Sequence, residues 1–167
     1  MINRLQITTM LSALIVGLPL SGATVQAESQ TVQIGSTIKT SKLEIQITSV
    51  KTLSRVGGEM LESKASDGGV YLAVQWNYKN ISDVPISTFN QPSLHLKDPK
   101  GTKYDHDMEA SSSYASELSI DEKILSDLNP GIRVKGAEVF EVSKELFATP
   151  GWKLFIDADQ EIEIPIP

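Results

Sequence analysis

The stretch Gly69-Val-Tyr-Leu-Ala-Val-Gln-Trp-Asn-Tyr-Lys-Asn80 decides the fold of this chain. Its side chains alternate with a period of two, which is typical of a β-strand. One face would carry Val70, Leu72, Val74, Trp76 and Tyr78. The other face, with Tyr71, Ala73, Gln75, Asn77 and Lys79, is more polar. The pattern predicts a long strand with one face in a hydrophobic core and the other mostly in water. Trp76 and Tyr78 are therefore expected in the core, and Tyr71 is expected to be exposed.

Further segments alternate in the same way and are separated by turns rich in Gly, Pro and Asn. Leu43–Val50 changes phase near Ser49, which predicts a β-bulge. In residues 132–142 Glu138 interrupts the apolar face, so a second bulge is expected at Gly136–Ala137. Shorter candidate strands are 93–97, 102–104, 152–156 and 160–167. Together these segments predict an all-β fold, an antiparallel β-sandwich of about seven to nine strands.

Residues 105–129 are the least β-like part of the chain, because Ala, Ser and Glu dominate residues 108–118. Ser119 and Glu122 have the spacing of a helix capping box. Apolar residues also recur at intervals of four in Ile120, Ile124 and Leu128. We expect one or two short helical turns within a long excursion from the sandwich.

The N-terminus has the pattern of a secretory signal peptide. Arg4 precedes an apolar run from residue 10 to residue 20, and small residues follow up to Ala27. We expect cleavage between Ala27 and Glu28, which would leave residues 28–167 as a single mature domain. An uncleaved anchoring helix is the alternative, although the run is shorter than the ~20 apolar residues that span a membrane. No segment of the mature chain is expected to span one.

Composition excludes several classes of function. The 167 residues carry a formal net charge of −6 at pH 7, which disfavours binding to nucleic acid and to anionic lipid. Cysteine is absent, which removes disulfides, thiol catalysis, thiolate metal sites and a lipid-bearing cysteine. An exported domain of this kind must be stabilised by its hydrophobic core.

Several short motifs follow one another along the assigned strands. In order along the chain they are Ile34-Gly35, Leu43–Val50, Gly69–Asn80, Leu94–Asp98 with Gly101, Leu128–Gly131, Gly136 and Val139–Val142. In their order and spacing, these motifs resemble the secreted immunoglobulin-like domains of unknown function typified by the mycobacterial immunoprotective extracellular protein. These domains often carry a misleading telomeric repeat-binding factor label. The resemblance implies an immunoglobulin-like sandwich, export and no defined catalytic residues.

Two acidic groups are candidate binding sites. Carboxylates with one histidine could hold Ca²⁺, or Zn²⁺ through His106, although an acidic loop in water is the alternative. This candidate metal site consists of Asp98, Asp105, His106, Asp107 and Glu109. A second group forms an acidic stripe, either a wet edge that resists strand pairing or a site for a cation or a basic partner. The acidic stripe consists of Asp157, Asp159, Glu161 and Glu163. No cofactor is expected.

Three functions compete at this point. The leading hypothesis is a non-catalytic module that binds an unknown extracytoplasmic protein or ligand through loops at one end of the sandwich and through residues 105–129. A ligand or metal carrier is the second. A hydrolase is the third, because partners of a Ser-His-Asp triad meet only in space. It would need one of two histidines, and His95 is expected to face away from the core residues Leu94 and Leu96.

Overall fold

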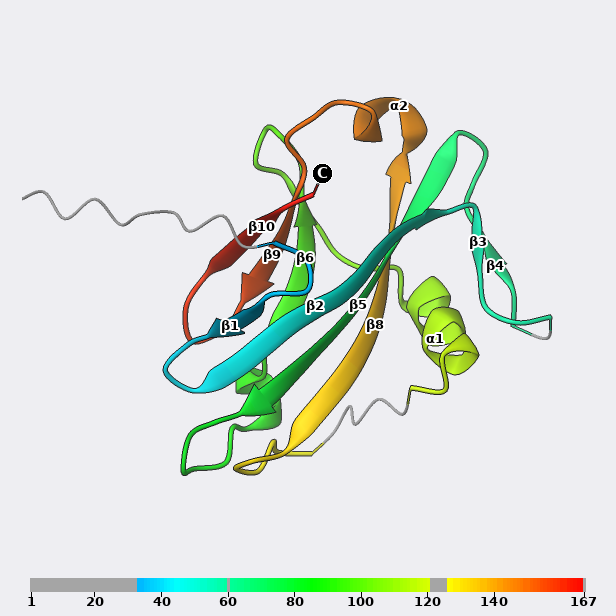
Figure 1. Ribbon diagram of the computed structural model, residues 1–167. Coiled ribbons are helices and arrows are strands. Elements are labelled where there is room, and N and C mark those ends of the chain that lie inside the picture. Colours follow the sequence, from blue (N-terminus) through cyan, green and yellow to red (C-terminus); the bar gives the residue numbers. More distant parts are fainter. Residues whose placement is uncertain (1–32, 60, 121–125, 167) are drawn as a thin grey trace, which may run out of the picture.

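The computed structural model describes residues 33–59, 61–120 and 126–166. Within these ranges the strands form two four-stranded antiparallel sheets, which enclose one core, and a two-stranded ribbon (Figure 1). The first sheet has the order β1 (Thr37–Lys39), β2 (Leu43–Leu53), β5 (Gly69–Asn80), β8 (Arg133–Ser143). The second has the order β10 (Ile162–Pro165), β9 (Lys153–Asp157), β6 (Ser93–Lys97), β7 (Lys103–Tyr104). The ribbon pairs β3 (Arg55–Val56) with β4 (Ser63–Lys64), and the helices are η1 (Thr88–Asn90), α1 (Met108–Glu117) and α2 (Lys144–Phe147). The predicted antiparallel β-sandwich is confirmed, with the two-residue ribbon strands as an unpredicted addition. The predicted signal peptide, residues 1–27, lies outside the described residues.

Strand β5 occupies the centre of the first sheet and has the bounds that the sequence predicts. It pairs with β2 on one side and with β8 on the other. Leu72, Val74 and Trp76 are buried between the two sheets, as expected from the alternation. Facing them from the second sheet are the buried residues Leu94, Leu96, Leu154 and Ile156. This apolar layer holds the two sheets together.

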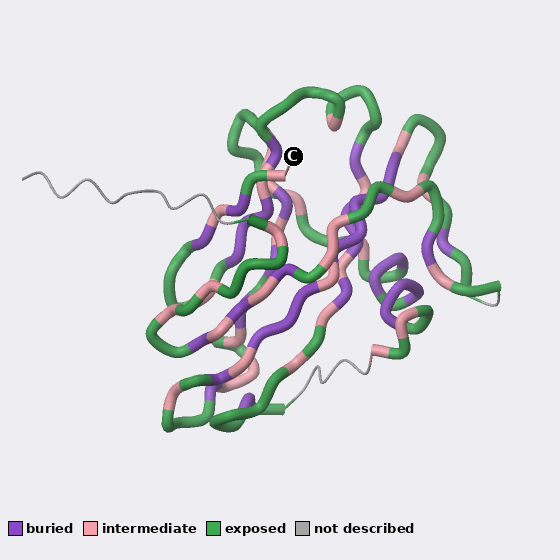
Figure 2. The backbone as a smooth tube through the Cα atoms, viewed as in Figure 1, coloured by how far each residue is buried: buried purple, intermediate pink, exposed green. Residues whose placement is uncertain are grey.

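The opposite face of β5 is also buried, which corrects the expectation of a wet face. Tyr71 was expected to be exposed, but only 3% of it is accessible to solvent. Helix α1 covers this face and forms a second core with it (Figure 2). The small residues Ala73 and Ala137 on the sheet leave room for the helix to approach closely. The second core consists of Val56, Tyr71, Ala73, Ala110, Tyr114, Ala115, Ala137 and Val139.

Helix α1 is attached to the open edge of β8 as well as to the sheet face. The Asp107 N–H donates to the Val139 carbonyl at 2.8 Å, and the Ser111 hydroxyl accepts from the Val139 N–H at 2.9 Å. The Asp107 carboxylate also accepts from the Ala110 N–H at 2.9 Å, so Asp107 is the N-cap of the helix. The N-cap of the helix, Asp107, therefore lies twelve residues before the predicted capping box at Ser119, whose partner Glu122 lies outside the described residues. Residues 108–117 form one packed helix rather than short turns in a free excursion.

One of the two predicted bulges is present. The pairing of β2 with β5 shifts register between Ile47 and Ser49, as the sequence predicts. The pairing of β5 with β8 continues without a shift past Gly136, so the second predicted bulge is wrong. The reason is the Trp76 indole, because a Cβ at Gly136 would lie 2.5 Å from its Nε1. Glu138 consequently stays on the inward side of an edge strand, where its Oε2 lies 3.9 Å from His106 Nδ1.

We expect Trp76→Ala to lower the free energy of unfolding by about 3–5 kcal/mol, because it would leave a large cavity at the centre of the core. Urea denaturation followed by circular dichroism measures this change. Phe89→Ala is the matched control, since Phe89 is 98% exposed and its loss should change stability by less than about 0.5 kcal/mol. Equal losses for the two variants would contradict the assignment of Trp76 to the core.

Candidate functional site

A hollow of about 580 Å³ lies at one end of the sandwich. Three parts of the chain contribute to it, namely the β1–β2 turn with Lys42, residues 84–91 between β5 and β6, and residues 157–159, where β9 ends and the next turn begins. These connections lie at the lower left of Figure 1, away from α1 and the ribbon. Leu43 and Ile86, which are both buried, line the hollow where it meets the core. Its volume falls within the roughly 300–1,000 Å³ of ordinary ligand pockets.

The connection between β5 and β6 is held in place by a buried asparagine. The Asn80 side-chain nitrogen donates to the carbonyls of Val84 and Leu128, each at 2.8 Å. Its side-chain oxygen accepts from the Ser82 N–H at 2.9 Å. Ile86 and Leu128 form a bridge through both of their backbone groups. The loop therefore has a fixed path although it contains no long helix or strand.

A second set of hydrogen bonds fixes the part of the loop that contains η1. The Asp127 carboxylate accepts from the Thr88 N–H at 3.2 Å. The Gln91 side chain accepts from the Tyr78 hydroxyl at 3.0 Å and donates to the Ser126 carbonyl at 2.8 Å. These bonds hold both ends of the short η1 turn on which Phe89 lies.

Large apolar side chains gather in water around the hollow. Phe89, which lines it, is 98% exposed, and Val84 is 53% exposed. Ile81 and Ile132 are exposed at the same end, where the Asn80 N–H donates to the Ile132 carbonyl. We call these four residues the apolar rim. Exposed large apolar side chains grouped at one end of a domain are typical of interaction sites.

Charged side chains face the hollow from the other connections. Asp157 is the last residue of β9, Asp159 follows in the next turn, and Lys42 lies in the β1–β2 turn. The Asp159 carboxylate accepts from the Ser41 hydroxyl at 2.6 Å and from the Lys42 N–H at 3.1 Å. Burial opposes the ionisation of Asp159, but these bonds outweigh it and lower the pKa of its carboxyl. The hollow thus combines an apolar rim with carboxylates.

The structure does not bring the candidate metal ligands together. Asp98 stays in its turn, where it accepts from the N–H groups of Lys100 and Thr102, and Asp107 caps α1. Asp105 binds His95, and His106 lies near Glu138. Glu109 follows in the first turn of α1. Over residues 33–59, 61–120 and 126–166, no three possible ligands are placed to hold a metal ion. Local N–H groups use two of the carboxylates, Asp98 and Asp107, that the spacing suggested for a cation.

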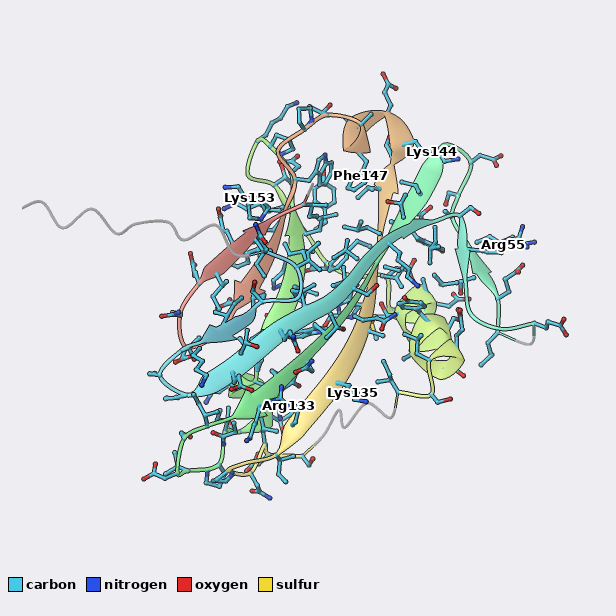
Figure 3. All side chains as sticks on the ribbon, viewed as in Figure 1. Arg55, Arg133, Lys135, Lys144, Phe147 and Lys153 are labelled. Carbon is cyan, nitrogen blue, oxygen red and sulfur yellow. The ribbon has the colours of Figure 1, made fainter. Side chains whose placement is uncertain are left out.

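The acidic stripe is divided in a similar way. Glu163 accepts from Lys97 at 2.5 Å and from Lys153 at 2.7 Å, and Lys153 is labelled in Figure 3. Hydrogen bonds from Lys153 and Lys97 lower the pKa of Glu163 to about 2. Asp157 and Asp159 belong to the hollow instead, and Glu161 is exposed. The stripe is therefore not a single site.

Ser93, His95 and Asp105 form a hydrogen-bonded line that sequence reasoning did not single out. His95 Nε2 lies 3.1 Å from the Ser93 hydroxyl, and Nδ1 lies 2.9 Å from the Asp105 carboxylate. Ser93 and His95 share a strand face because they are two residues apart. His95 faces away from Leu94 and Leu96, as predicted, and lies against Phe155. Ser93 also lines the hollow, so this line borders it.

Comparison with known proteins gives the family. The model of a domain of unknown function, DUF4352, matches residues 32–147. The chain belongs to the DUF4352 family. The match runs from before β1 to the end of α2 and includes the loop with Phe89. The predicted membership of a β-sandwich family of unknown function is confirmed at this level, while the immunoglobulin-like and secreted assignments stay predictions.

Relatives of this DUF4352 chain have similar lengths and no named activity. The uncharacterized protein YxkC of Bacillus subtilis is 47% identical over 141 residues, which cover 83% of this chain and 78% of YxkC. A conserved hypothetical protein from Bacillus anthracis has a crystal structure with a TM-score of 0.70 and 28% identity, covering 78% of this chain and 93% of that one. The crystal structure of an uncharacterized β-sandwich protein from Clostridium difficile has a TM-score of 0.56 and 17% identity, and the match covers 81% of this chain and 93% of that one. The last likeness concerns the fold alone.

Among the described residues, the helices are too short and too polar for any of them to cross a membrane.

The Glu163 ion pairs predict a pH dependence of stability. Because the folded-state pKa is about 2, against an ordinary value of 4.5, Glu163 stabilises the fold above about pH 4.5 and loses this effect as the pH falls towards 2. The difference in unfolding free energy between the wild type and Glu163→Gln should be at most about 1 kcal/mol near pH 6, since the pairs are partly exposed. Denaturant titrations should show this difference shrinking below pH 4.5. Glu145→Gln, on the exposed helix α2, controls for the lost charge. A difference that grows on acidification would contradict the pairing.

Proposed function

We propose that this DUF4352 chain is an exported, non-catalytic binding module whose contact surface is the hollow and its apolar rim. The observation that carries the proposal is Phe89, a 98% exposed aromatic ring held beside a preformed hollow. Keeping such a ring in water is unfavourable, and aromatic side chains are enriched at binding hot spots. Loops on a rigid scaffold are also the usual carriers of binding.

The described part of the 105–129 segment contributes less to this surface than the sequence suggests. Helix α1 turns Ala110, Tyr114 and Ala115 towards the sheet, and they are buried there. The proposal therefore assigns binding to the loops at the end of the sandwich where β5 ends and β8 begins, namely residues 81–92 and 157–161.

Export rests on the sequence pattern of residues 1–27. N-terminal sequencing of the protein recovered outside the cytoplasm should begin at Glu28. A cell-associated chain that retains residues 1–27 would contradict cleavage.

The contact surface can be tested by site-specific photocrosslinking. We expect a photoreactive phenylalanine analogue at position 89 to form a crosslinked adduct in the native host, because this side chain would lie in the interface. The same analogue at Met108 is the matched control, since Met108 is 77% exposed but lies at the start of α1. Adducts are detected by denaturing electrophoresis and identified by mass spectrometry. Equal yields at both positions, or adducts only at 108, would contradict the proposed surface.

A second candidate function, ester hydrolysis, is favoured by the line of Ser93, His95 and Asp105. Ser93 Oγ would attack an ester carbonyl, and its proton would pass to His95 Nε2 and then to the leaving alkoxide. Water would release the acyl group from Ser93 by the reverse proton path. The argument against this function is that the Asp105 side chain is 88% exposed, whereas the aspartate of a triad is buried where it orients the imidazole. We therefore place it second.

A fluorophosphonate probe separates the two candidates. A binding module should show no more labelling than its Ser93→Ala variant. A hydrolase should be labelled at Ser93, with at least a tenfold loss on His95→Ala and none on Ser87→Ala, whose serine also lines the hollow. Mass spectrometry of the labelled peptide measures the outcome, and clear labelling at Ser93 would contradict a non-catalytic module.

A further inference from the structure

The apolar rim extends beyond the hollow. Val84 and Phe89 line it, while Ile81 and Ile132 lie at the same end without lining it. A small molecule seated in the hollow would leave these outer residues in water. A protein surface could cover them together, and exposed apolar patches that extend in this way are typical of protein interfaces.

The hollow suits one large apolar side chain. Buried Leu43 and Ile86 line it, with Pro85 and Ala158 beside them. These four residues form an apolar patch in a lining that is otherwise mostly polar, with Ser87, Asn90 and Gln91 among its members. A large apolar side chain placed against the patch gains burial, and it has no hydrogen bonds of its own to water to lose. Interfaces of this kind are organised around such an anchor in a pocket.

The charges around the hollow favour a cationic neighbour of that anchor. Asp157 and Asp159 line it, and Asp127 adjoins it through its hydrogen bond to Thr88. Among the described lining residues Lys42 is the single basic one. Arg133, labelled near the lower end of Figure 3, is already hydrogen-bonded to Glu44 and Asn77. The net charge of the whole chain is −6, so the chain as a whole is negative like these carboxylates and also favours a cationic partner.

We infer that the occupant is a segment of a partner protein in which a large apolar side chain enters the hollow and an adjacent Lys or Arg meets Asp157 and Asp159. This inference rests on the proposed function and specifies the chemistry of the partner. The exposed ring of Phe89 would add a cation–π contact to the same basic group. Asp157 is the more informative of the two carboxylates, because Asp159 also holds the β1–β2 turn through Ser41 and Lys42.

Peptide selection on the mature chain 28–167 tests this inference. We expect a random heptapeptide display library to yield binders in which a Leu, Ile, Met, Phe or Trp lies within two positions of a Lys or Arg. Affinities of the synthetic peptides, measured by fluorescence polarisation, should fall at least about tenfold for Phe89→Ala and for Asp157→Lys. They should also weaken between about 0.05 and 0.5 M salt, because the charge contact is partly exposed. Met108→Ala and Asp67→Lys, at exposed positions elsewhere, should leave the affinity unchanged.

The outcomes distinguish this inference from the proposed function. If Phe89→Ala weakens binding but Asp157→Lys and salt do not, the hollow binds a segment without a basic residue and the inference is overturned while the proposed function stands. If neither variant weakens binding, both fail. Enrichment of neutral or acidic peptides, or no enrichment, also overturns the inference. The same holds if sedimentation experiments show that the chain self-associates and that Phe89→Ala abolishes this self-association.

Discussion

The burial of β5 on both faces is the constraint on which the rest of the structure depends. One face packs against the second sheet through Leu72, Val74 and Trp76, and the other packs against α1 through Tyr71 and Ala73. Loss of either layer would expose one apolar face of this strand to water. The strand therefore couples the two cores, and both of its neighbours, β2 and β8, take their register from it.

Trp76 shows how one side chain sets this register. The indole needs the space above Gly136, and the pairing of these two residues puts β8 in continuous register with β5. Glu138 then has to face inwards at an edge strand, close to His106. The register that makes room for Trp76 therefore leaves Glu138 at an inward position. The alternation within a single strand does not reveal such a coupling between two strands.

The sequence predicted correctly those features that depend on interactions between residues close together in the chain. The bounds of β5, the bulge near Ser49 and the turns follow from alternation and turn chemistry within a few residues. The prediction for Tyr71 failed because alternation cannot distinguish a face in water from a face under a helix. The available signal was Ala73 on β5 and Ala137 on β8, since small side chains on the face of a sheet allow a helix to approach closely.

The candidate site shows the same limit. The cluster of acidic residues around His106 looked like a metal site, but Asp98 and Asp107 are used by N–H groups in their own turns. The line of Ser93, His95 and Asp105 depends on the chain returning after β6, which places Asp105 beside His95. The hollow depends on parts of the chain that are distant in sequence. The apolar residues Val84 and Phe89, in a loop that otherwise reads as a turn, were the signal available beforehand.

A preformed hollow requires that residues 81–92 be as ordered as the strands that they join. The bonds of Asn80 and the bridge between Ile86 and Leu128 supply this order, and Phe89 is thereby held in water rather than folded onto the core. The central claim is that this surface exists before any partner binds, which lowers the entropic cost of binding.

Amide hydrogen exchange resolved by NMR tests that claim most directly. If the hollow is preformed, the amides of Ile86 and Leu128, which bond each other's carbonyls at 3.0 and 2.8 Å, should exchange within about tenfold of the slowest amides of β5. If these two amides instead exchange as fast as those of an exposed turn such as residues 66–68, the loop opens freely in solution and a preformed binding surface is contradicted.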